Sequence, residues 1–222
     1  LVGSEMCIRD RAETAAEMLA GVEAPRALDL CAGTGCLGLG VKRLCPAAQV
    51  VCVEKSPEAY VYLEKNTRLA LKGRGGSTES VLDASPFEEP AFDWGMKPTR
   101  AAEPVEGDLF TYWETLPEGQ LDLIVSNPPY VPQSDLAAMH ANVRGYEPRE
   151  ALFVPDDDAL RFYRAIARAG RRMLRPGGKL YFEIYERSAG QMRLLLGEEG
   201  YTDTEVREDL NGKPRMVCSR MK

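Results

Sequence analysis

The tetrapeptide Asn127-Pro128-Pro129-Tyr130 holds the residues of this sequence that are best placed to do chemistry, directly after an apolar run of strand type. The side-chain oxygen of Asn127 and the backbone carbonyl of Pro128 are two acceptors that can hold one planar NH2 group. Because prolines fix their own φ and restrict the residue before them, these acceptors are oriented before any ligand binds. Tyr130 adds an aromatic face on which a flat amide or base can stack.

A site of this kind suits the transfer of a methyl group to nitrogen. The lone pair of an amide or aromatic amino nitrogen is delocalised, so the group is a poor nucleophile and must be held with its face toward the methyl donor. Proximity and alignment then supply most of the acceleration. No strong base is required, because the nitrogen becomes acidic as the new bond forms. The alternative is a proline-rich strand exit without a function, and the position beside a cofactor loop argues against it.

The cofactor loop is a glycine-rich segment. Residues 33–38 read GTGCLG and match the pattern G-x-G-x-x-G, and Glu54 ends the next predicted strand. Glycines allow a sharp turn and a close approach of the backbone to a ligand, and the following helix offers free N–H groups. A carboxylate at the second strand end can accept hydrogen bonds from ribose hydroxyls. NAD and S-adenosylmethionine both fit this pattern, and a tight turn without a ligand is the structural alternative.

Asp29 favours S-adenosylmethionine over NAD. It precedes the glycine loop in the sequence, which places a carboxylate near the end of the strand, where a cationic methionine moiety would lie. Beside a pyrophosphate the same charge would be repelled. The alternative for Asp29 is a hydrogen bond to backbone N–H groups in the turn.

Alternating strands and helices must position these residues, and the alternation predicts a doubly wound, mostly parallel α/β sheet. Buried strands are expected at 27–31, 49–53, 121–126 and 179–184, the last after the turn Pro176-Gly177-Gly178. Helices are expected at 12–21, from the glycine loop to about Leu44, and from Ser56 or Pro57 to about Leu71. A last pair at 202–207 and 215–219 is predicted to form an antiparallel edge.

Two segments depart from this pattern. Residues 73–104 lack periodicity and collect Gly, Pro, Ser and acidic residues, so we expect a flexible insertion, with Val105 and Glu106 as the remains of a strand. Residues 1–11 show no helical or strand period and resemble the in-frame translation of a synthetic sequencing adapter. We therefore expect one native domain, 12–222, behind a non-native prefix.

Composition narrows the possible partners. The chain has 222 residues, a net charge of −6 and 44% hydrophobic residues. No apolar run approaches the ~18 residues that span a bilayer, and no signal peptide is evident, so we expect a cytoplasmic protein without a membrane segment. The acidic balance argues against stable binding to nucleic acid. A run of arginines at helical spacing is interpreted as a solvated face rather than a docking patch; it comprises Arg161, Arg164, Arg168, Arg171 and Arg172.

Several single residues receive modest interpretations. The cysteines that fall in predicted strands and helices are expected to be buried free thiols, because no CxxC pair occurs; they are Cys31, Cys36, Cys45 and Cys52. His140, the only histidine, is expected on the surface. Glu183 ends a strand and could face the crevice, but a structural hydrogen bond is favoured. No function is assigned to Trp94 or Trp113.

The order of six motifs resembles the HemK/PrmC family: LDLCAGTGCLGL, VCVEKSPEA, GDLF, LDLIVSNPPYVP, YEPREAL and PGGKLYFEI. The resemblance covers about residues 12–222. Members of that family methylate the side-chain amide nitrogen N5 of the glutamine in the GGQ loop of class 1 peptide chain release factors. The NPPY motif alone is shared with nucleic-acid adenine methyltransferases, and the segment at 146–152, YEPREAL, makes the resemblance more specific.

The resemblance implies a fold and a set of site residues. The fold is a class I S-adenosylmethionine-dependent methyltransferase fold, a Rossmann-like sheet of seven strands with an antiparallel last hairpin. Asn127 to Tyr130 would hold the acceptor amide, and Thr14 matches a segment near the substrate end of the cofactor. No metal is implied. The implied cofactor contacts, with Asp29 added from its own position, are Asp29, Cys31, Ala32, Gly33, Thr34, Gly35, Glu54, Asp108, Leu109 and Asn127.

This sequence also departs from the family. The usual N-terminal helical domain, which helps to dock the release factor, has no counterpart here, and we expect a gene fragment. Cys31 and Ala32 stand at the start of the usual G-T/S-G-x-G loop, where small side chains are tolerated. Two other functions stay open: an enzyme that methylates an exocyclic nitrogen of adenine or guanine in nucleic acid, and a non-catalytic module that binds the cofactor.

Overall fold

A computed structural model of the chain describes residues 2–72, 102–138, 149–209 and 211–222, with side chains from Asp10 onward and up to Ala70 in the first range. Of the helices in these ranges, none combines the length and the apolar character that crossing a membrane requires. His140, Trp94, most of the predicted insertion and the first residues of YEPREAL lie outside the described residues.

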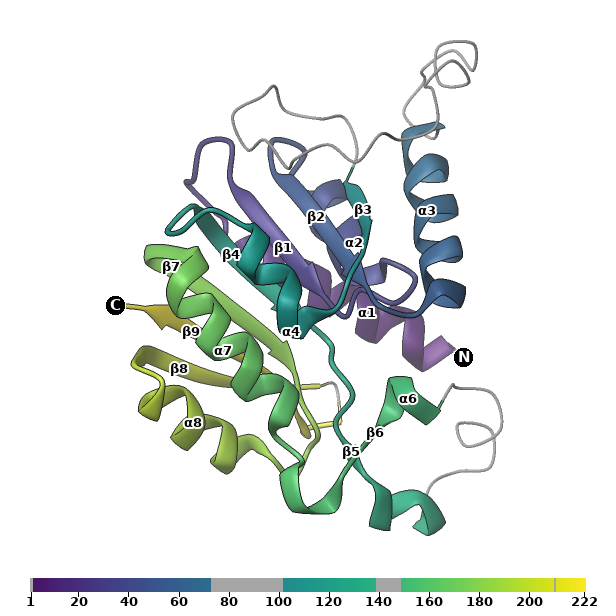
Figure 1. Cartoon of the computed structure of the whole chain (residues 1–222), viewed down its shortest axis with the longest axis vertical. Coiled ribbons are helices and arrows are strands. Elements are labelled where there is room, and N and C mark those ends of the chain that lie inside the picture. The colour runs from purple at the N-terminus through teal and green to yellow at the C-terminus, as the bar shows by residue number, and fades with distance from the viewer. Residues whose placement is uncertain (1, 73–101, 139–148, 210) are drawn as a thin grey trace.

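A seven-stranded sheet forms the centre of the molecule, in the order β3-β2-β1-β4-β7-β9-β8 (Figure 1). The pairs from β3 to β7 are parallel, whereas β9 runs antiparallel to both β7 and β8. The predicted doubly wound sheet with an antiparallel last hairpin is therefore confirmed. The strands are β1 Arg26–Leu30, β2 Gln49–Glu54, β3 Glu103–Glu106, β4 Leu121–Ser126, β7 Leu174–Glu183, β8 Tyr201–Glu208 and β9 Pro214–Met221.

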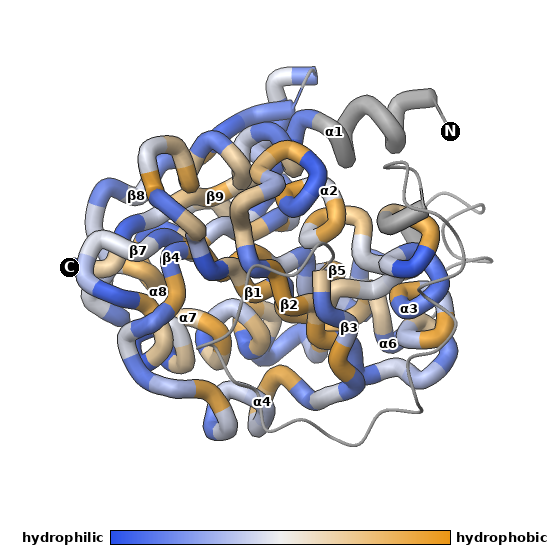
Figure 2. Tube along the Cα trace, turned by 90° about the horizontal axis from the view of Figure 1, so that it is seen from above, coloured by the Kyte–Doolittle hydropathy of each residue, from blue (hydrophilic) through white to orange (hydrophobic). Residues whose placement is uncertain are grey.

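Helices cover both faces of this sheet. Seen from above, α1 and α2 lie on one side of the sheet, and α4, α7 and α8 lie on the other (Figure 2). The α-helices are α1 Val2–Glu17, α2 Cys36–Leu44, α3 Pro57–Lys72, α4 Leu109–Tyr112, α6 Arg149–Leu152, α7 Arg161–Met173 and α8 Ala189–Glu198. Short 3-10 turns η2, η3 and η4 span Trp113–Thr115, Gln133–Ala138 and Asp156–Asp158. A two-stranded parallel sheet joins β5 Val131–Pro132 to β6 Phe153–Val154.

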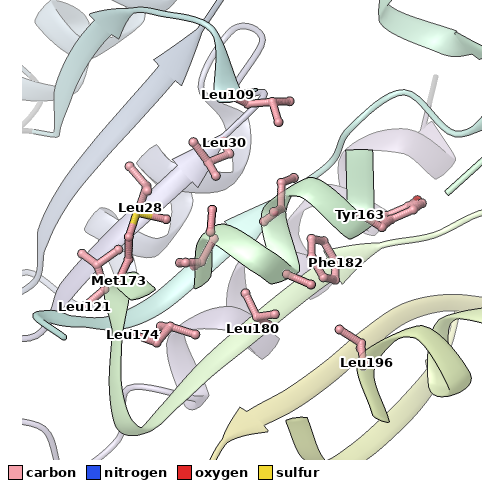
Figure 3. Close-up of a cluster of buried hydrophobic side chains, with 14 of the residues drawn as sticks. Leu28, Leu30, Leu109, Leu121, Tyr163, Met173, Leu174, Leu180, Phe182 and Leu196 are labelled. Atoms are coloured by element: carbon pink, nitrogen blue, oxygen red, sulfur yellow. The ribbon is translucent and has the colours of Figure 1, made fainter. Parts of the chain in front are cut away.

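The central strands β1, β2 and β4 are buried almost throughout, because each face of the sheet packs against helices there. Neighbouring residues of one strand serve different cores: Leu28 and Leu30 belong to the cluster under α7 and α8, whereas Ala27 belongs to the cluster under α1 and α2. In the first cluster, Tyr163 of α7 meets the edge of Phe182 of β7, with ring centroids 5.2 Å apart (Figure 3). Two separate layers of core therefore hold the central strands in place.

The first helix differs from its prediction. It begins at Val2 rather than residue 12 and ends at Glu17, and Gly21 at φ 79° completes the turn that follows. The helix packs closely on α2, since a Cβ on Gly40 would lie 2.5 Å from the Cβ of Ala12. Once its packed turns are formed, a helix extends by one hydrogen bond per residue without needing a further apolar face. The absence of a helical period over 1–11 thus did not prevent a helix there, and the origin of these residues stays a prediction.

The boundaries of two strands also differ from their predicted positions. Strand β3 begins at Glu103, so the predicted insertion ends earlier than residue 104. Pro104 is tolerated because β3 is the outermost strand of the sheet, where a missing N–H breaks no ladder. Strand β7 begins at Leu174 and includes the predicted Pro-Gly-Gly turn as an irregularity in its pairing with β4, with Gly177 at φ 79°.

Candidate functional site

The predicted site residues lie at or directly after the ends of neighbouring strands, at one edge of the sheet. Leu30, the last residue of β1, pairs with Ser126 at the end of β4 and with Val53 near the end of β2. The loop after β1 and the tetrapeptide after β4 therefore begin side by side. The chain reverses its direction of travel across the sheet between β1 and β4, which is where ligands bind in open α/β sheets.

The glycine loop turns through left-handed backbone conformations. Gly33 has φ 57° and Gly35 has φ 90°, which glycine adopts without strain. A Cβ on Gly35 would lie 2.6 Å from the Cδ1 of Leu63, whereas a Cβ on Gly33 would have no atom within 4 Å. The loop thus packs tightly against α3 at Gly35 and leaves open space beside Gly33. The Asn66 amide of α3 donates to the Thr34 carbonyl at 2.9 Å and holds the loop from above.

Glu54 connects the loop to the end of β2. One carboxylate oxygen accepts from the N–H of Gly33 at 2.7 Å, and the other accepts from the N–H of Ser56 at 2.8 Å. The Glu54 carbonyl accepts from the N–H of Gly107, after β3. Its carboxylate is therefore fixed at the strand ends, and each of its oxygens keeps further lone pairs for a ligand.

Asp29 lies beneath the loop and not in it. Its side chain is 1% exposed, and one oxygen accepts from the N–H of Gly38 at 2.7 Å. The alternative interpretation of Asp29, a hydrogen bond to a backbone N–H, is confirmed, although the donor lies in the first turn of α2 and not in the strand-to-helix turn. Burial raises the pKa of Asp29 to about 7, the Gly38 N–H offsets part of this rise, and Glu54 adds to it. A role in holding the cofactor stays a prediction.

The cysteines near the loop differ from one another. Cys31 is partly buried and adopts φ 60°, a left-handed conformation that is strained for a residue with a side chain. Burial and the carboxylates of Glu54 and Asp29 raise its thiol pKa far above the ordinary value, so the thiol is protonated at neutral pH. Cys52 is buried as predicted, whereas Cys36 is exposed because it begins α2 at the mouth of the loop.

Asp108 and Leu109 follow β3, the strand beyond Glu54. Asp108 caps α4 by accepting from the N–H of Phe110 at 3.0 Å, and it forms an ion pair of 2.9 Å with the exposed Lys55. Partial burial by itself raises the pKa of Asp108, but the Phe110 N–H and Lys55 outweigh it and leave the pKa below its ordinary value. The carboxylate is therefore ionised at neutral pH and stands at the rim of the same edge.

The tetrapeptide presents its polar end outward. Asn127 is exposed, Pro128 is buried, and Pro129 and Tyr130 are intermediate. The preceding Ser126 is fully buried, and its hydroxyl donates to the Leu30 carbonyl, which ties the end of β4 to that of β1. The Asn127 side chain is thus available to a ligand while its backbone is held by packed neighbours.

The segment that begins with YEPREAL meets the tetrapeptide, although residues 146–148 are not described. The N–H of Tyr130 donates to the carbonyl of Leu152 at 3.2 Å, and β5 pairs with β6 immediately afterwards. Ser134 then donates to Asp156 from both its N–H and its hydroxyl at 2.9 Å. The described end of YEPREAL therefore contacts the tetrapeptide through Leu152.

The residues that surround Tyr130 on the β7 side of the tetrapeptide were not predicted as a group. Glu183, 4% exposed at the end of β7, accepts from the Tyr130 hydroxyl at 3.1 Å. Tyr185 stacks on Tyr130, with centroids 6.3 Å apart and an interplanar angle of 19°, and donates to Asp135 at 2.6 Å. The structural hydrogen bond expected for Glu183 is confirmed. The strand register carried a usable signal, since a strand directly beside β4 places its last residues next to Asn127.

The positive charges of the arginine run on α7 are largely paired with acidic side chains or aromatic rings. Arg164 pairs with Asp158, and Arg172 pairs with Glu118 while its guanidinium lies 5.4 Å from the Trp113 ring. Arg168 and Arg171 both pair with Glu199, and Arg161 lies over the rings of Phe110 and Phe162. These contacts agree with the interpretation as a solvated face. Trp113, for which no function was assigned, packs on this helix through the same contact.

Thr14 lies far from the glycine loop in sequence and within α1 in the structure. It is buried at 8% exposure, and the Arg207 guanidinium lies 3.4 Å from both its hydroxyl and the Glu17 carboxylate. Arg207 belongs to β8, so this contact ties α1 to the far edge of the sheet. The expected closeness of Thr14 to the substrate end of the cofactor stays a prediction.

Known proteins resemble this chain in sequence. No protein-family model matches the chain. The release factor glutamine methyltransferase of Bacteroides thetaiotaomicron is 36% identical over 197 residues, which cover 89% of this chain and 60% of that protein. The protein of the same name from Deinococcus radiodurans is 35% identical over 206 residues, covering 93% of this chain and 62% of its own length. The chain therefore spans less than two thirds of the length of these relatives.

Solved structures of methyltransferases share the fold. A S-adenosylmethionine-dependent methyltransferase from Aquifex aeolicus superposes with a TM-score of 0.58 over 95% of this chain and 89% of its own, at 12% identity. A predicted O-methyltransferase from Agrobacterium tumefaciens superposes with a TM-score of 0.57 over 94% of this chain and 79% of its own, at 20% identity. At these identities the likeness establishes the fold alone. The chain is therefore a relative, over 89% of its length, of curated release factor glutamine methyltransferases, and it has the fold of class I S-adenosylmethionine-dependent methyltransferases.

Proposed function

We propose that this chain transfers a methyl group from S-adenosylmethionine to the side-chain amide nitrogen N5 of the glutamine in the GGQ loop of class 1 release factors. The observation that carries the proposal is the pairing of Leu30 with Ser126, which brings the glycine loop and the Asn-Pro-Pro-Tyr tetrapeptide to adjacent strand ends. A cofactor loop and a grip for a planar NH2 group are thereby placed beside each other. The names of the relatives support the identity of the acceptor.

The residues at the strand ends fit the cofactor. The open space beside Gly33 leaves room for a ligand against the backbone, and the fixed carboxylate of Glu54 is suited to accept hydrogen bonds from ribose hydroxyls. Asp108 and the N–H of Leu109 would lie toward the adenine. When bound, S-adenosylmethionine supplies an electrophilic methyl group on a sulfonium centre. The buried Asp29 lies below the loop, and in its ionised form it favours a cation over a pyrophosphate.

The acceptor side is built to orient a flat amide. The exposed Asn127 oxygen and the Pro128 carbonyl would accept the two N–H bonds, and the Tyr130 ring would support one face of the amide. Held in this way, the nitrogen faces the methyl donor, and it loses its proton to solvent only as the new bond forms. Alignment then supplies most of the rate acceleration, so the transfer requires no strong base.

The experiment that tests this proposal incubates the chain with a class 1 release factor and cofactor carrying a labelled methyl group. Label on the GGQ glutamine is expected, and a release factor whose GGQ glutamine is replaced by alanine should take up none. Label on added RNA or DNA instead would identify a nucleic-acid methyltransferase. Binding of S-adenosylhomocysteine without any transfer would identify a non-catalytic module. In the same titration NADH should not bind, because ionised Asp29 beneath the loop disfavours a pyrophosphate.

The relations to partners and location follow from the same proposal. We propose the GGQ loop of release factors as the partner surface that enters the site, and a cytoplasmic location. Ion pairs of the α7 arginines with Asp158, Glu118 and Glu199 support a protein acceptor over nucleic acid, since they leave less free positive charge for phosphates.

A further inference from the structure

Tyr130 is held from two sides by residues outside the tetrapeptide. Its hydroxyl donates to Glu183 at 3.1 Å, and its ring stacks on Tyr185 at 6.3 Å between centroids. The Tyr185 hydroxyl donates in turn to Asp135 at 2.6 Å, on the 3-10 turn η3 that follows the tetrapeptide. A tyrosine that only filled space would not need the hydrogen bond to Glu183.

Burying the Glu183 carboxylate at this position costs free energy. Its side chain is 4% exposed, and a buried carboxylate requires partners to offset the loss of hydration. One oxygen accepts from Tyr130, and the other forms an ion pair of 2.6 Å with Arg11. The backbone carbonyl of Glu183 also accepts from the Tyr163 hydroxyl at 2.8 Å, which fixes the main chain beneath the carboxylate. The carboxylate is therefore held firmly and aimed at the tyrosine of the site.

The register of the sheet explains why Glu183 can reach Tyr130. Strand β7 lies beside β4, and Phe182 pairs with Ser126. Glu183 therefore stands level with Asn127, on the flank of the site opposite to β1. The glycine loop follows β1, so the carboxylate touches the acceptor side of the site and not the cofactor side.

We propose that Glu183 is a positioning residue of the acceptor site, which fixes the ring plane of Tyr130 so that the platform for the acceptor amide is set before substrate binds. This inference rests on the proposed function. Tyr185, itself hydrogen-bonded to Asp135, stacks on the Tyr130 ring, so Tyr130 is held both at its hydroxyl and at its ring face. Because Glu183 acts through Tyr130, its loss should lower turnover and leave cofactor binding intact.

The variants follow from the geometry. Glu183→Ala removes the acceptor of the Tyr130 hydroxyl, Tyr130→Phe removes its donor, and Glu183→Gln keeps an oxygen that can accept. Tyr130→Phe deletes one hydroxyl and retains the ring, so it gives a reading even if Glu183→Ala folds poorly. Glu186→Ala is the matched control, since that carboxylate pairs with Lys213 at 2.9 Å on the same strand exit.

The kinetic test measures kcat and KM for release factor, together with S-adenosylhomocysteine affinity. Glu183→Ala and Tyr130→Phe should each lower kcat by about 10-fold or more, since misalignment costs rate directly. Glu183→Gln should stay within about 3-fold of the wild type, and cofactor affinity should not change in any variant. The double variant Glu183→Ala with Tyr130→Phe should be no worse than either single variant, because both remove one interaction. Effects that multiply, or a parallel loss of cofactor affinity, would overturn the proposal.

A second measurement separates this inference from the proposed function. The chain is labelled with ¹³C-tyrosine and studied without release factor. The Tyr130 ring signal is the one that disappears in Tyr130→Phe. Glu183→Ala should shift or broaden this signal, and Glu186→Ala should leave it unchanged. If the wild-type chain methylates no release factor while the Tyr130 signal responds as expected, the proposed acceptor is wrong and the positioning contact stands. A Tyr130 signal that does not respond to Glu183→Ala overturns the contact, whatever the activity.

Discussion

The carboxylate of Asp29 accepts a hydrogen bond of 2.7 Å from the backbone N–H of Gly38, beneath the glycine loop. This contact joins the end of β1 to the first turns of α2. The other carboxylate oxygen of Asp29 is buried without a hydrogen-bond partner among the described residues. A cofactor loop is thus supported by a carboxylate that is only half satisfied in the folded chain, which makes stability sensitive to its protonation.

Asp29 should make the unfolding free energy depend on pH. Its pKa rises from 3.8 to about 7 on folding, so between these values the folded state binds more protons than the unfolded state. The stabilisation is full below about pH 4 and is lost as pH rises toward 7, by roughly 4 kcal/mol on the scale of about 1.4 kcal/mol per pKa unit. Asp29→Asn should flatten this dependence in urea unfolding between pH 4 and 8. Glu118→Gln, on an exposed carboxylate, should not. Equal slopes in wild type and Asp29→Asn would contradict the shifted pKa.

Gly38 should not tolerate a side chain. A Cβ there would lie 2.5 Å from the sulfur of Cys52 and 2.8 Å from the Asp29 carboxylate, and both neighbours are buried. Gly38→Ala should therefore lower the unfolding free energy by about 1–3 kcal/mol, the usual cost of overpacking. Gly197→Ala in α8, where a Cβ meets nothing within 4 Å, should raise it by about 0.5–1 kcal/mol. Urea titrations of the two variants should move in opposite directions, and a stable Gly38→Ala would show that the loop can shift.

Asn127 should be needed for turnover and not for cofactor binding. It is exposed at the end of β4, so its removal leaves the packed backbone of the site unchanged. Asn127→Ala should lower kcat by about 100-fold or more, the scale of a misplaced reacting group. Calorimetry with S-adenosylhomocysteine should give a Kd within a few fold of the wild type. Retained activity would refute the proposed grip on the amide.

Glu54 should be needed for cofactor binding. Both of its oxygens are already fixed by the N–H groups of Gly33 and Ser56, so its remaining lone pairs are oriented before ligand arrives. Glu54→Ala should weaken S-adenosylhomocysteine by at least about 10-fold, consistent with the loss of hydrogen bonds to a charged group of roughly 1.5–3 kcal/mol. Glu58→Ala, at an exposed position early in α3, is the control. An unchanged Kd for Glu54→Ala would remove this residue from the cofactor site.

The hydroxyl of Tyr181 should contribute nothing to stability. It is buried in the cluster under α1 and α2 and lacks a hydrogen-bond partner within the described ranges. Tyr181→Phe should leave the unfolding free energy unchanged or raise it by about 1 kcal/mol, because a buried polar group without a partner costs free energy. Thermal unfolding of Tyr181→Phe tests this prediction. A lower melting temperature than that of the wild type would show that the hydroxyl has a partner.

Local patterns predicted most of the sheet and the turn of the glycine loop. The glycine loop was recognisable because Gly33 and Gly35 meet a backbone requirement within a few residues. Helix α8 was not predicted, since Gly190 and Gly197 weaken its helical pattern, and it forms because Met192 and Leu196 are buried against the sheet. Likewise the extension of α1 over the first residues depends on propagation from turns that pack on α2, and not on a period of its own.

By itself, the sequence determined the alternation of strands and helices, the place of the glycine loop after β1, and the chemistry of a tetrapeptide that can hold a planar NH2 group. Only the tertiary structure decided that Asp29 supports the loop from below, and that Leu152 and Glu183 fix Tyr130 from two sides. The physical reason is separation along the chain. Backbone propensity and apolar period act between near neighbours, whereas these contacts arise from strand register and packing between segments that no local pattern relates.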